Sequence, residues 1–266
     1  MDILQGLILG IVQGLTEFLP VSSSGHLELF QHIFGIKEGA ATFDVAVHLA
    51  TLIAVIAVFW KDIIEIIKRP FSKITLLILV GTAPTLAIAL ALKKTVENLL
   101  STGSTLGIEF IITGLALWFA ESIKTKNKEE KETTYVDALI IGIAQGIAIM
   151  PAISRSGLTI SSALFRGLKR EFAAKYSFLL SIPIILAAAA DTTLDIVKHK
   201  TSTSIEFFPM IVGMVAAAIS GYIAVKFMIK MISKGNLRVF SYYVFVLGGL
   251  IILDQLFFHI FFTLKF

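Results

Sequence analysis

Two short polar stretches interrupt the apolar sequence of this chain: Pro20-Val21-Ser22-Ser23-Ser24-Gly25 and Pro151-Ala152-Ile153-Ser154-Arg155-Ser156-Gly157. Each lies between two apolar segments that are too short or too interrupted to cross a membrane, because a spanning helix needs about 20 residues. We expect each pair of segments to form a hairpin that enters the membrane, breaks and leaves on the same side: 3–19 with 24–36, and 135–150 with 156–165. Broken backbone is tolerated there only where protein or a wet cavity satisfies its polar groups. Both breaks should therefore be buried and face something polar.

The composition places the whole chain in a membrane. Of its 266 residues, 56% are hydrophobic and 16% are charged, and the mean hydropathy is +0.86. Soluble domains carry roughly 25% charged residues, so a soluble enzyme, a disordered regulator and a nucleic-acid binder are all poor interpretations, despite the net charge of +4. The chain has no cysteine, which excludes disulfide scaffolds, thiolate zinc sites and iron–sulfur clusters.

Six further apolar segments can cross the membrane: 43–60, 74–92, 106–121, 172–190, 207–229 and 240–262. The predicted fold is an all-α polytopic membrane protein, a single integral membrane domain over 1–266 with six transmembrane helices and two re-entrant helical hairpins.

The order of short and long segments repeats, and so does the sequence. At a gapless offset of 132, eight identities occur: Gly10/Gly142, Ile11/Ile143, Gln13/Gln145, Gly14/Gly146, Ser22/Ser154, Ser24/Ser156, Gly25/Gly157 and Gly81/Gly213. The first repeat covers 1–121, a charged cytoplasmic linker covers 122–134, and the second repeat covers 135–266. Because three crossings per half is an odd number, the second repeat should be inverted, an arrangement in which broken helices meet near the midplane.

The positive charges give an independent orientation. Fourteen Lys and Arg residues lie in the loops 61–73, 122–134, 166–171 and 230–238, against six on the opposite face. By the positive-inside rule the first face is cytoplasmic. We therefore expect a multi-pass protein of the plasma membrane with both termini outside.

The first polar stretch and the segment before it carry several groups suited to chemistry. Gln13 and Glu17 stand four residues apart, on one face of a helix. An ionisable group inside a membrane segment is a functional candidate by default. Ser22 to Ser24 can cap the next helix, whose N-terminus attracts anions. His26 could act as general acid, general base or nucleophile.

The second stretch supplies a cation. The guanidinium of Arg155 can hold phosphate oxygens bidentately, and Gly157 permits close backbone approach. Ser154, Ser156 and Thr159 add hydroxyl groups. If the inverted halves bring the two breaks together, the combination suits phosphoryl transfer, in which catalysis is largely positioning and charge stabilisation.

Simpler interpretations remain open for these residues. The serines could be helix caps only, and Arg155 could merely neutralise Glu17 across the repeat interface. Asp44 and His48, one helical turn apart near the start of a spanning segment, could support the site or cap the helix at the membrane interface. The second of these interpretations is favoured slightly.

Over essentially its whole length the chain resembles the undecaprenyl-pyrophosphate phosphatase family of the bacitracin-resistance type. Gln13-x-x-x-Glu17 is similar to the family's Glu/Gln-x-x-x-Glu motif, Pro20 to His26 to its Pro-Val-Ser-Ser-Thr/Ser-Gly-His stretch, and Pro151 to Thr159 to its Pro-Gly-x-Ser-Arg-Ser-Gly-x-Thr motif. The resemblance implies six spanning helices with two re-entrant hairpins, commonly as a homodimer. It also implies an enzyme that removes the terminal phosphate of a polyprenyl diphosphate, which recycles the lipid carrier of cell-envelope glycan synthesis.

The resemblance also implies roles for individual residues. Those expected to be catalytic are Glu17, Ser23, His26 and Arg155, and those expected to bind substrate are Gln13, Ser22, Ser24, Ser154, Ser156, Gly157 and Thr159. A divalent cation, Mg²⁺ or Ca²⁺, is expected at Glu17. Two positions depart from the family pattern: Gln13 takes the amide form of a position that is often Glu, and Ala152 replaces a glycine.

The mechanism and one rival function stay open at this point. The nucleophile is Ser23, His26 or an activated water. A polyprenyl-phosphate flippase would use the same anion-binding groups, because inverted repeats with broken helices also describe transporters. A purely structural membrane module explains neither Arg155 nor His26 at the breaks.

Overall fold

The computed structural model describes residues 1–36, 39–123, 127–199, 207–234 and 236–258. Apart from one isolated bridge between Lys128 and Leu168, all regular structure in these ranges is helical. The elements are α1 (Ile3–Phe18), α2 (Ser23–Ile33), α3 (Ala40–Val58), α4 (Trp60–Lys68), α5 (Lys73–Thr102), α6 (Leu106–Glu121), the 3₁₀ turn η1 (Glu130–Glu132), α7 (Tyr135–Ile147), α8 (Arg155–Phe165), α9 (Arg170–His199), α10 (Phe207–Lys234), α11 (Arg238–Leu253) and the π-helical turn η2 (Asp254–Phe258).

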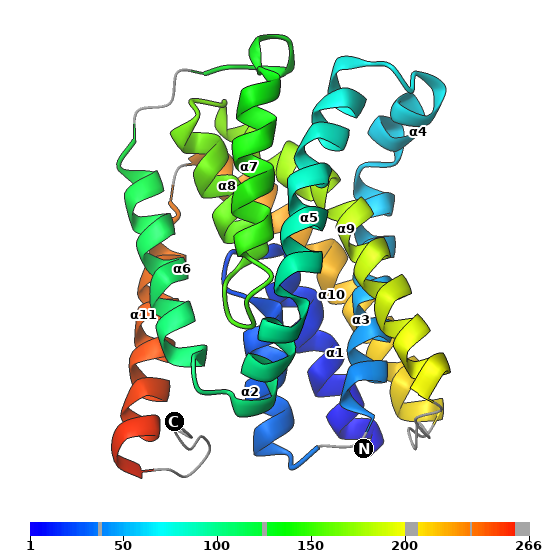
Figure 1. The fold of residues 1–266 in the computed structure, drawn as a ribbon, viewed down its shortest axis with the longest axis vertical. Coiled ribbons are helices and arrows are strands. Elements are labelled where there is room, and N and C mark those ends of the chain that lie inside the picture. Colours follow the sequence, from blue (N-terminus) through cyan, green and yellow to red (C-terminus); the bar gives the residue numbers. More distant parts are fainter. Residues whose placement is uncertain (37–38, 124–126, 200–206, 235, 259–266) are drawn as a thin grey trace.

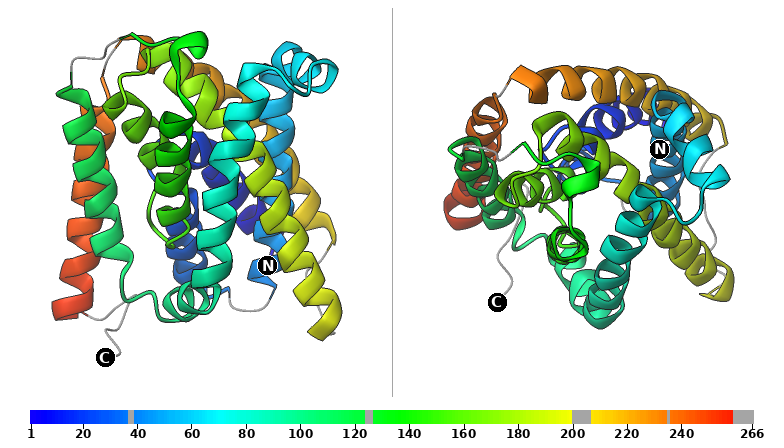
Figure 2. Two further views of the ribbon diagram at one scale, coloured as in Figure 1. Left: turned by 45° about the horizontal axis from the view of Figure 1, so that its top comes forward. Right: turned by 90° about the horizontal axis from the view of Figure 1, so that it is seen from above.

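The two predicted helix–break–helix units are confirmed. The first is α1 followed by α2, and the second is α7 followed by α8, with arms of 16, 11, 13 and 11 residues. Helix α1 ends at Phe18 because Leu19 precedes a proline and is extended, with φ −71° and ψ 143°. The short helices lie between the longer ones (Figures 1 and 2).

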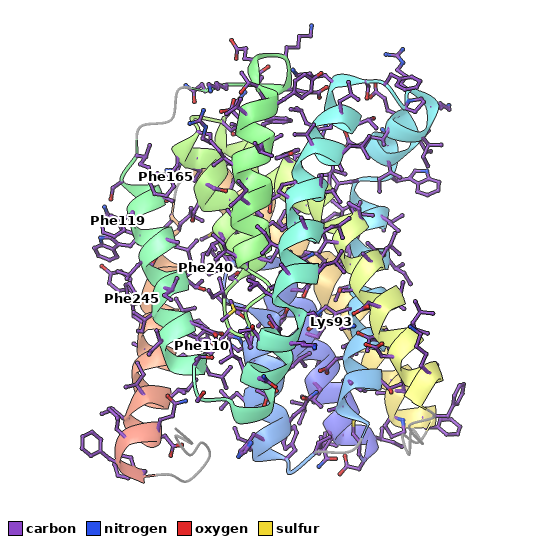
Figure 3. The ribbon with its side chains drawn as sticks, in the orientation of Figure 1. Lys93, Phe110, Phe119, Phe165, Phe240 and Phe245 are labelled. Atoms are coloured by element: carbon purple, nitrogen blue, oxygen red, sulfur yellow. The ribbon has the colours of Figure 1, made fainter. Side chains whose placement is uncertain are left out.

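Five helical stretches are long and apolar enough to cross a membrane: Ala40–Val58, Lys73–Val96, Arg170–Asp195, Phe207–Ser233 and Arg238–Phe258. The remaining predicted span, 106–121, forms the 16-residue helix α6, which packs along α11. Large apolar side chains stay exposed on the outside of the molecule, among them Phe119 (57%) and Phe165 (51%) (Figure 3). Such a surface is typical of a protein that sits in lipid.

Three predicted boundaries were wrong or incomplete. The predicted loop 61–73 contains helix α4, because the sequence of Trp60–Lys68 has the apolar and charged spacing of an amphipathic helix. The side chain of Ile67 on this helix stays 72% exposed. Helices α5 and α9 extend well beyond the predicted ends at 92 and 190. The last four residues of the predicted span 240–262, and residues 124–126 of the linker, lie outside the described residues.

Close glycine contacts join each short hairpin to a long helix. A Cβ on Gly10 of α1 would collide with the carbonyl oxygen of Gly213 on α10, and a Cβ on Gly142 of α7 would collide with that of Gly81 on α5. Only glycine lets two helix backbones approach so closely. The two contacts are related by the offset of 132, since Gly142 follows Gly10 and Gly213 follows Gly81 by that number of residues. The part of the chain that supplies the short-helix glycine in one contact supplies the long-helix glycine in the other.

The helix bundle has two ends that carry different elements. Helix α1 begins and α11 ends at one end, whereas α4, the start of α7 and the end of α8 lie at the other (Figure 1). At this second end, the linker is tied to the turn after α8, since Lys128 donates to the Gly167 carbonyl (3.0 Å) and accepts from the Lys169 amide (2.8 Å). The buried carboxylate of Asp137 accepts from Arg166 (2.7 Å) and Lys128 (3.1 Å).

Candidate active site

The buried carboxylate of Glu17 joins the two halves of the chain. Its Oε1 atom accepts from Nη2 of Arg155, 138 residues away in the sequence. Its Oε2 atom accepts from Ser23 Oγ at 2.5 Å and from Gln13 Nε2 at 3.0 Å. Only 4% of Glu17 is exposed. The two breaks therefore meet at one point, as the sequence predicted.

Both breaks end in a serine that caps the following helix. Ser22 Oγ accepts from the Gly25 amide (3.3 Å) at the start of α2, and Ser154 Oγ accepts from the Gly157 amide (3.0 Å) at the start of α8. The N-termini of both helices thus lie beside the Glu17–Arg155 pair. A helix N-terminus attracts anions because its free N–H groups and its dipole present positive charge.

Ser24 and Ser156, both predicted to bind substrate, cross-link the two breaks. Ser24 Oγ donates to the Pro151 carbonyl of the second break, and Ser156 Oγ donates to the Leu19 carbonyl of the first (3.1 Å). Ser156 follows Ser24 by 132 residues, and Pro151 follows Leu19 by the same offset. The two hydrogen bonds are therefore one contact made twice, which we call the serine cross-links.

Arg155 is held between the two halves. In addition to its ion pair with Glu17, its Nη1 lies 3.4 Å from the Ser181 carbonyl oxygen on α9. Its side chain is 18% exposed, against 2% for that of Glu17. Arg155 is therefore the more accessible member of the pair.

Thr159 does not join Glu17. It is fully buried, and its hydroxyl bonds to the Arg155 carbonyl (2.8 Å) and to Ser177 Oγ on α9 (2.6 Å). These contacts hold the first turn of α8, which carries Arg155, against α9.

His26 also faces away from the Glu17 carboxylate. Its Nδ1 lies 2.6 Å from the Ser22 carbonyl oxygen, and its Nε2 lies 2.7 Å from the hydroxyl of Tyr243 on α11. The imidazole stacks on the Tyr243 ring at 5.6 Å and meets the edge of Phe110 at 5.4 Å. Both ring nitrogens are thus already engaged.

Sequence reasoning did not connect His48 with Glu17. Nε2 of His48 lies 3.5 Å from Glu17 Oε2, and its Nδ1 bonds to the Asp44 carbonyl (2.7 Å). The interfacial cap favoured for Asp44 is wrong, because Gly39 caps α3 and the Asp44 carboxylate instead accepts from Gln31 (2.6 Å). The four-residue spacing of Asp44 and His48 was visible in the sequence, but the proximity of His48 to Glu17 was not.

Two polar side chains of α6 hold the second break and were also missed. Glu109 accepts from the Ala152 amide at 2.5 Å, and Thr113 accepts from the Ser154 amide at 3.0 Å. They stand one turn apart in an otherwise apolar segment. A carboxylate in such a segment is unusual, so Glu109 could have been recognised from the sequence as a candidate for this role.

Comparison with known proteins identifies the family. The model of the family described as bacitracin resistance protein BacA matches residues 6–250. A protein of Carboxydothermus hydrogenoformans named undecaprenyl-diphosphatase is 56% identical over 256 residues, covering 96% of this chain and 98% of that protein. Undecaprenyl-diphosphatase 3 of Bacillus cereus is 48% identical over 255 residues (96% and 98%), and the undecaprenyl-diphosphatase of Methanosphaera stadtmanae is 39% identical over 270 residues (93% and 96%). The resemblance found in the three motifs is thus confirmed, and the chain belongs to the BacA family of multi-pass membrane proteins.

Proposed function

We propose that this protein removes the terminal phosphate from undecaprenyl diphosphate, or a similar polyprenyl diphosphate, releasing polyprenyl phosphate and inorganic phosphate. The observation that carries the proposal is the Glu17 carboxylate, hydrogen-bonded to a serine hydroxyl on one side and paired with Arg155 on the other. A nucleophile bonded to a base, beside a cation that can hold the phosphate, is the arrangement that phosphoryl transfer requires. The names of the relatives point to the same reaction.

Ser23 is the nucleophile that this geometry favours. Glu17 Oε2 takes the hydroxyl proton as Ser23 Oγ attacks the terminal phosphorus, and the bond from that phosphorus to the bridging oxygen breaks. Polyprenyl phosphate leaves, and water then hydrolyses the phosphoserine. His26 is less suitable, because hydrogen bonds occupy both its nitrogens. A water activated by Glu17 is the competing mechanism.

Arg155 and the two helix N-termini stabilise the phosphate charge. When the diphosphate enters, Arg155 exchanges its carboxylate partner for phosphate oxygens, which frees Glu17 to act as a base. The positive N-terminal ends of α2 and α8, which carry Ser23 and Arg155, would add to the stabilisation of the developing negative charge.

The residues around Glu17 fit a divalent cation. Gln13 Oε1 is buried without a hydrogen-bond partner, and Mg²⁺ is commonly held by one or two carboxylates together with substrate phosphates. Gln13 and Glu17 would hold the ion, which supplies charge neutralisation at the phosphate when bound. The second repeat has the glutamine but no carboxylate: Gln145 Oε1 is also buried without a hydrogen-bond partner, and Ile149 stands 132 residues after Glu17.

The full topology belongs to the same proposal: six spans, two re-entrant hairpins, and two inverted repeats with both termini outside the cell. The two glycine contacts between a short and a long helix and the two serine cross-links support this topology, because each kind of contact occurs twice at the offset of 132. The excess of positive charge at the end that carries α4 supports a cytoplasmic location for that end.

Phosphate release from detergent-solubilised undecaprenyl diphosphate tests the function. The wild type should release phosphate, whereas Ser23→Ala and Arg155→Ala should lose at least 100-fold in kcat. Ser233→Ala and Arg69→Ala, at exposed positions, serve as matched controls. A protein that binds the lipid but releases no phosphate would be a carrier, and the proposal would be wrong. A flippase needs Arg155 and the helix N-termini to bind an anionic lipid, but it does not need the hydrogen bond between Ser23 and Glu17.

A further inference from the structure

Ser22 has an unusual backbone conformation. Its φ is 69°, and Asn127 is the other non-glycine residue with positive φ in the described part of the chain. L-amino acids with a side chain adopt this conformation at a cost and keep it only where the surroundings hold it. Ser154, at the corresponding position of the second repeat, makes the same helix cap with φ −70°. Capping therefore does not require the left-handed backbone of Ser22.

The imidazole of His26 holds the strained peptide group. Its Nδ1–H donates to the Ser22 carbonyl at 2.6 Å, which leaves Nε2 of the neutral ring as an acceptor. The Tyr243 hydroxyl lies 2.7 Å from Nε2 and donates to it. The Tyr243 ring is nearly parallel to the imidazole, at 9°, while the Phe110 ring is perpendicular, at 88°. The orientation of His26 is thus fixed from several directions.

The second break provides an internal comparison for the first. The residue 132 positions after His26 is Leu158, and the residue 132 positions before Tyr243 is Ile111. Neither side chain can make a hydrogen bond, and Ser154 beside Leu158 is unstrained. Imidazole, phenol and left-handed serine therefore occur together at the first break and are absent together from the second.

The strained residue directly precedes the nucleophile of the proposed reaction. Ser23 Oγ lies 2.5 Å from Glu17 Oε2, and the peptide between Ser22 and Ser23 sets the direction of that side chain. We propose that Tyr243 and His26 are positioning residues that hold Ser22 in its left-handed conformation and so aim Ser23 at Glu17. This proposal rests on the proposed phosphatase function and assigns Tyr243 a part in it.

Tyr243→Phe tests the proposal with the loss of one hydroxyl. We expect kcat for undecaprenyl diphosphate to fall about fivefold, the effect of one net hydrogen bond, with KM changed less than twofold. Tyr242→Phe is the matched control, since Tyr242 is the neighbouring tyrosine and is 57% exposed. Thermal unfolding of both variants checks that they fold. An unchanged kcat in Tyr243→Phe would overturn the proposal, whereas absence of phosphate release by the wild type would instead refute the phosphatase function.

Variants of His26 separate positioning from nucleophilic attack. Asparagine keeps a donor near the place of Nδ1, whereas leucine, the residue of the second repeat, keeps none. We expect His26→Asn to retain at least tenfold more kcat than His26→Leu, and Ser22→Gly to raise the kcat of His26→Leu, because glycine adopts positive φ without strain. Equal inactivity of His26→Asn and His26→Leu, with phosphohistidine trapped in the wild type, would overturn the proposal.

Discussion

Replacing Ser24 and Ser156 with alanine distinguishes two roles for these serines. If they bind substrate, as their motifs imply, each loss should raise KM. The structure instead has each hydroxyl donating to a carbonyl of the opposite break. Since these bonds fix Ser23 relative to Arg155, we expect the variants to lower kcat and leave KM within twofold of the wild type.

The magnitude follows from the number of hydrogen bonds lost. Each alanine removes one hydrogen bond between the two breaks, a net effect of about 1 kcal/mol, or about fivefold in kcat. In each single variant the remaining cross-link still holds the two breaks together. The double variant should therefore lose more kcat than the product of the two single losses. Steady-state phosphate release over a range of undecaprenyl diphosphate concentrations gives both constants for the four proteins.

Two results would refute this reasoning. A rise of tenfold or more in KM with unchanged kcat would place the hydroxyls on the substrate. Strictly multiplicative losses would show that the two cross-links do not act on the same geometry. Ser233→Ala, at an exposed serine of α10, controls for the substitution itself.

Three further substitutions test other parts of the structure. Glu17→Gln should lower kcat at least 100-fold, because it removes both the base and the partner of Arg155; near-normal turnover in the phosphate assay would exclude Glu17 as the base. Gly142→Ala should destabilise the protein by about 1–3 kcal/mol, since its Cβ collides with the backbone of α5. Gly249→Ala, with open space around it, should leave the thermal midpoint unchanged, and equal midpoints for the two variants would contradict the close contact. Asp137→Asn should cost about 1–3 kcal/mol in the same unfolding assay, because it removes the charge that pairs with two partly exposed cations; a midpoint equal to the wild type would mean that this cluster adds no stability.

Local sequence was enough to predict the breaks and their meeting. Proline and capping serine residues end and restart helices within a few positions, so their effect is visible without tertiary structure. The offset of 132 then linked the two breaks. The sequence offered the pairing of Glu17 with Arg155 only as an alternative to phosphate binding, based on the tendency of buried membrane charges to find partners, and the structure contains this pair.

Contacts between distant segments could not be predicted in this way. Tyr243 meets His26 across 217 residues, and Glu109 meets Ala152 across 43. No spacing rule relates such positions. His26 itself was predicted to work beside Glu17, but the rotation of α2 between Ser23 and His26 points the two side chains toward different neighbours.

Ser23 and Arg155 occupy the same place in the two repeats, since each is the first residue of its helix and they are 132 residues apart. A symmetric assembly of two identical units would carry the same residue at both places, giving two hydroxyls or two guanidiniums around the carboxylate. Neither set provides both an attacking group and a counter-charge. In this chain the two positions carry different residues, so one hydroxyl and one guanidinium both contact the same carboxylate.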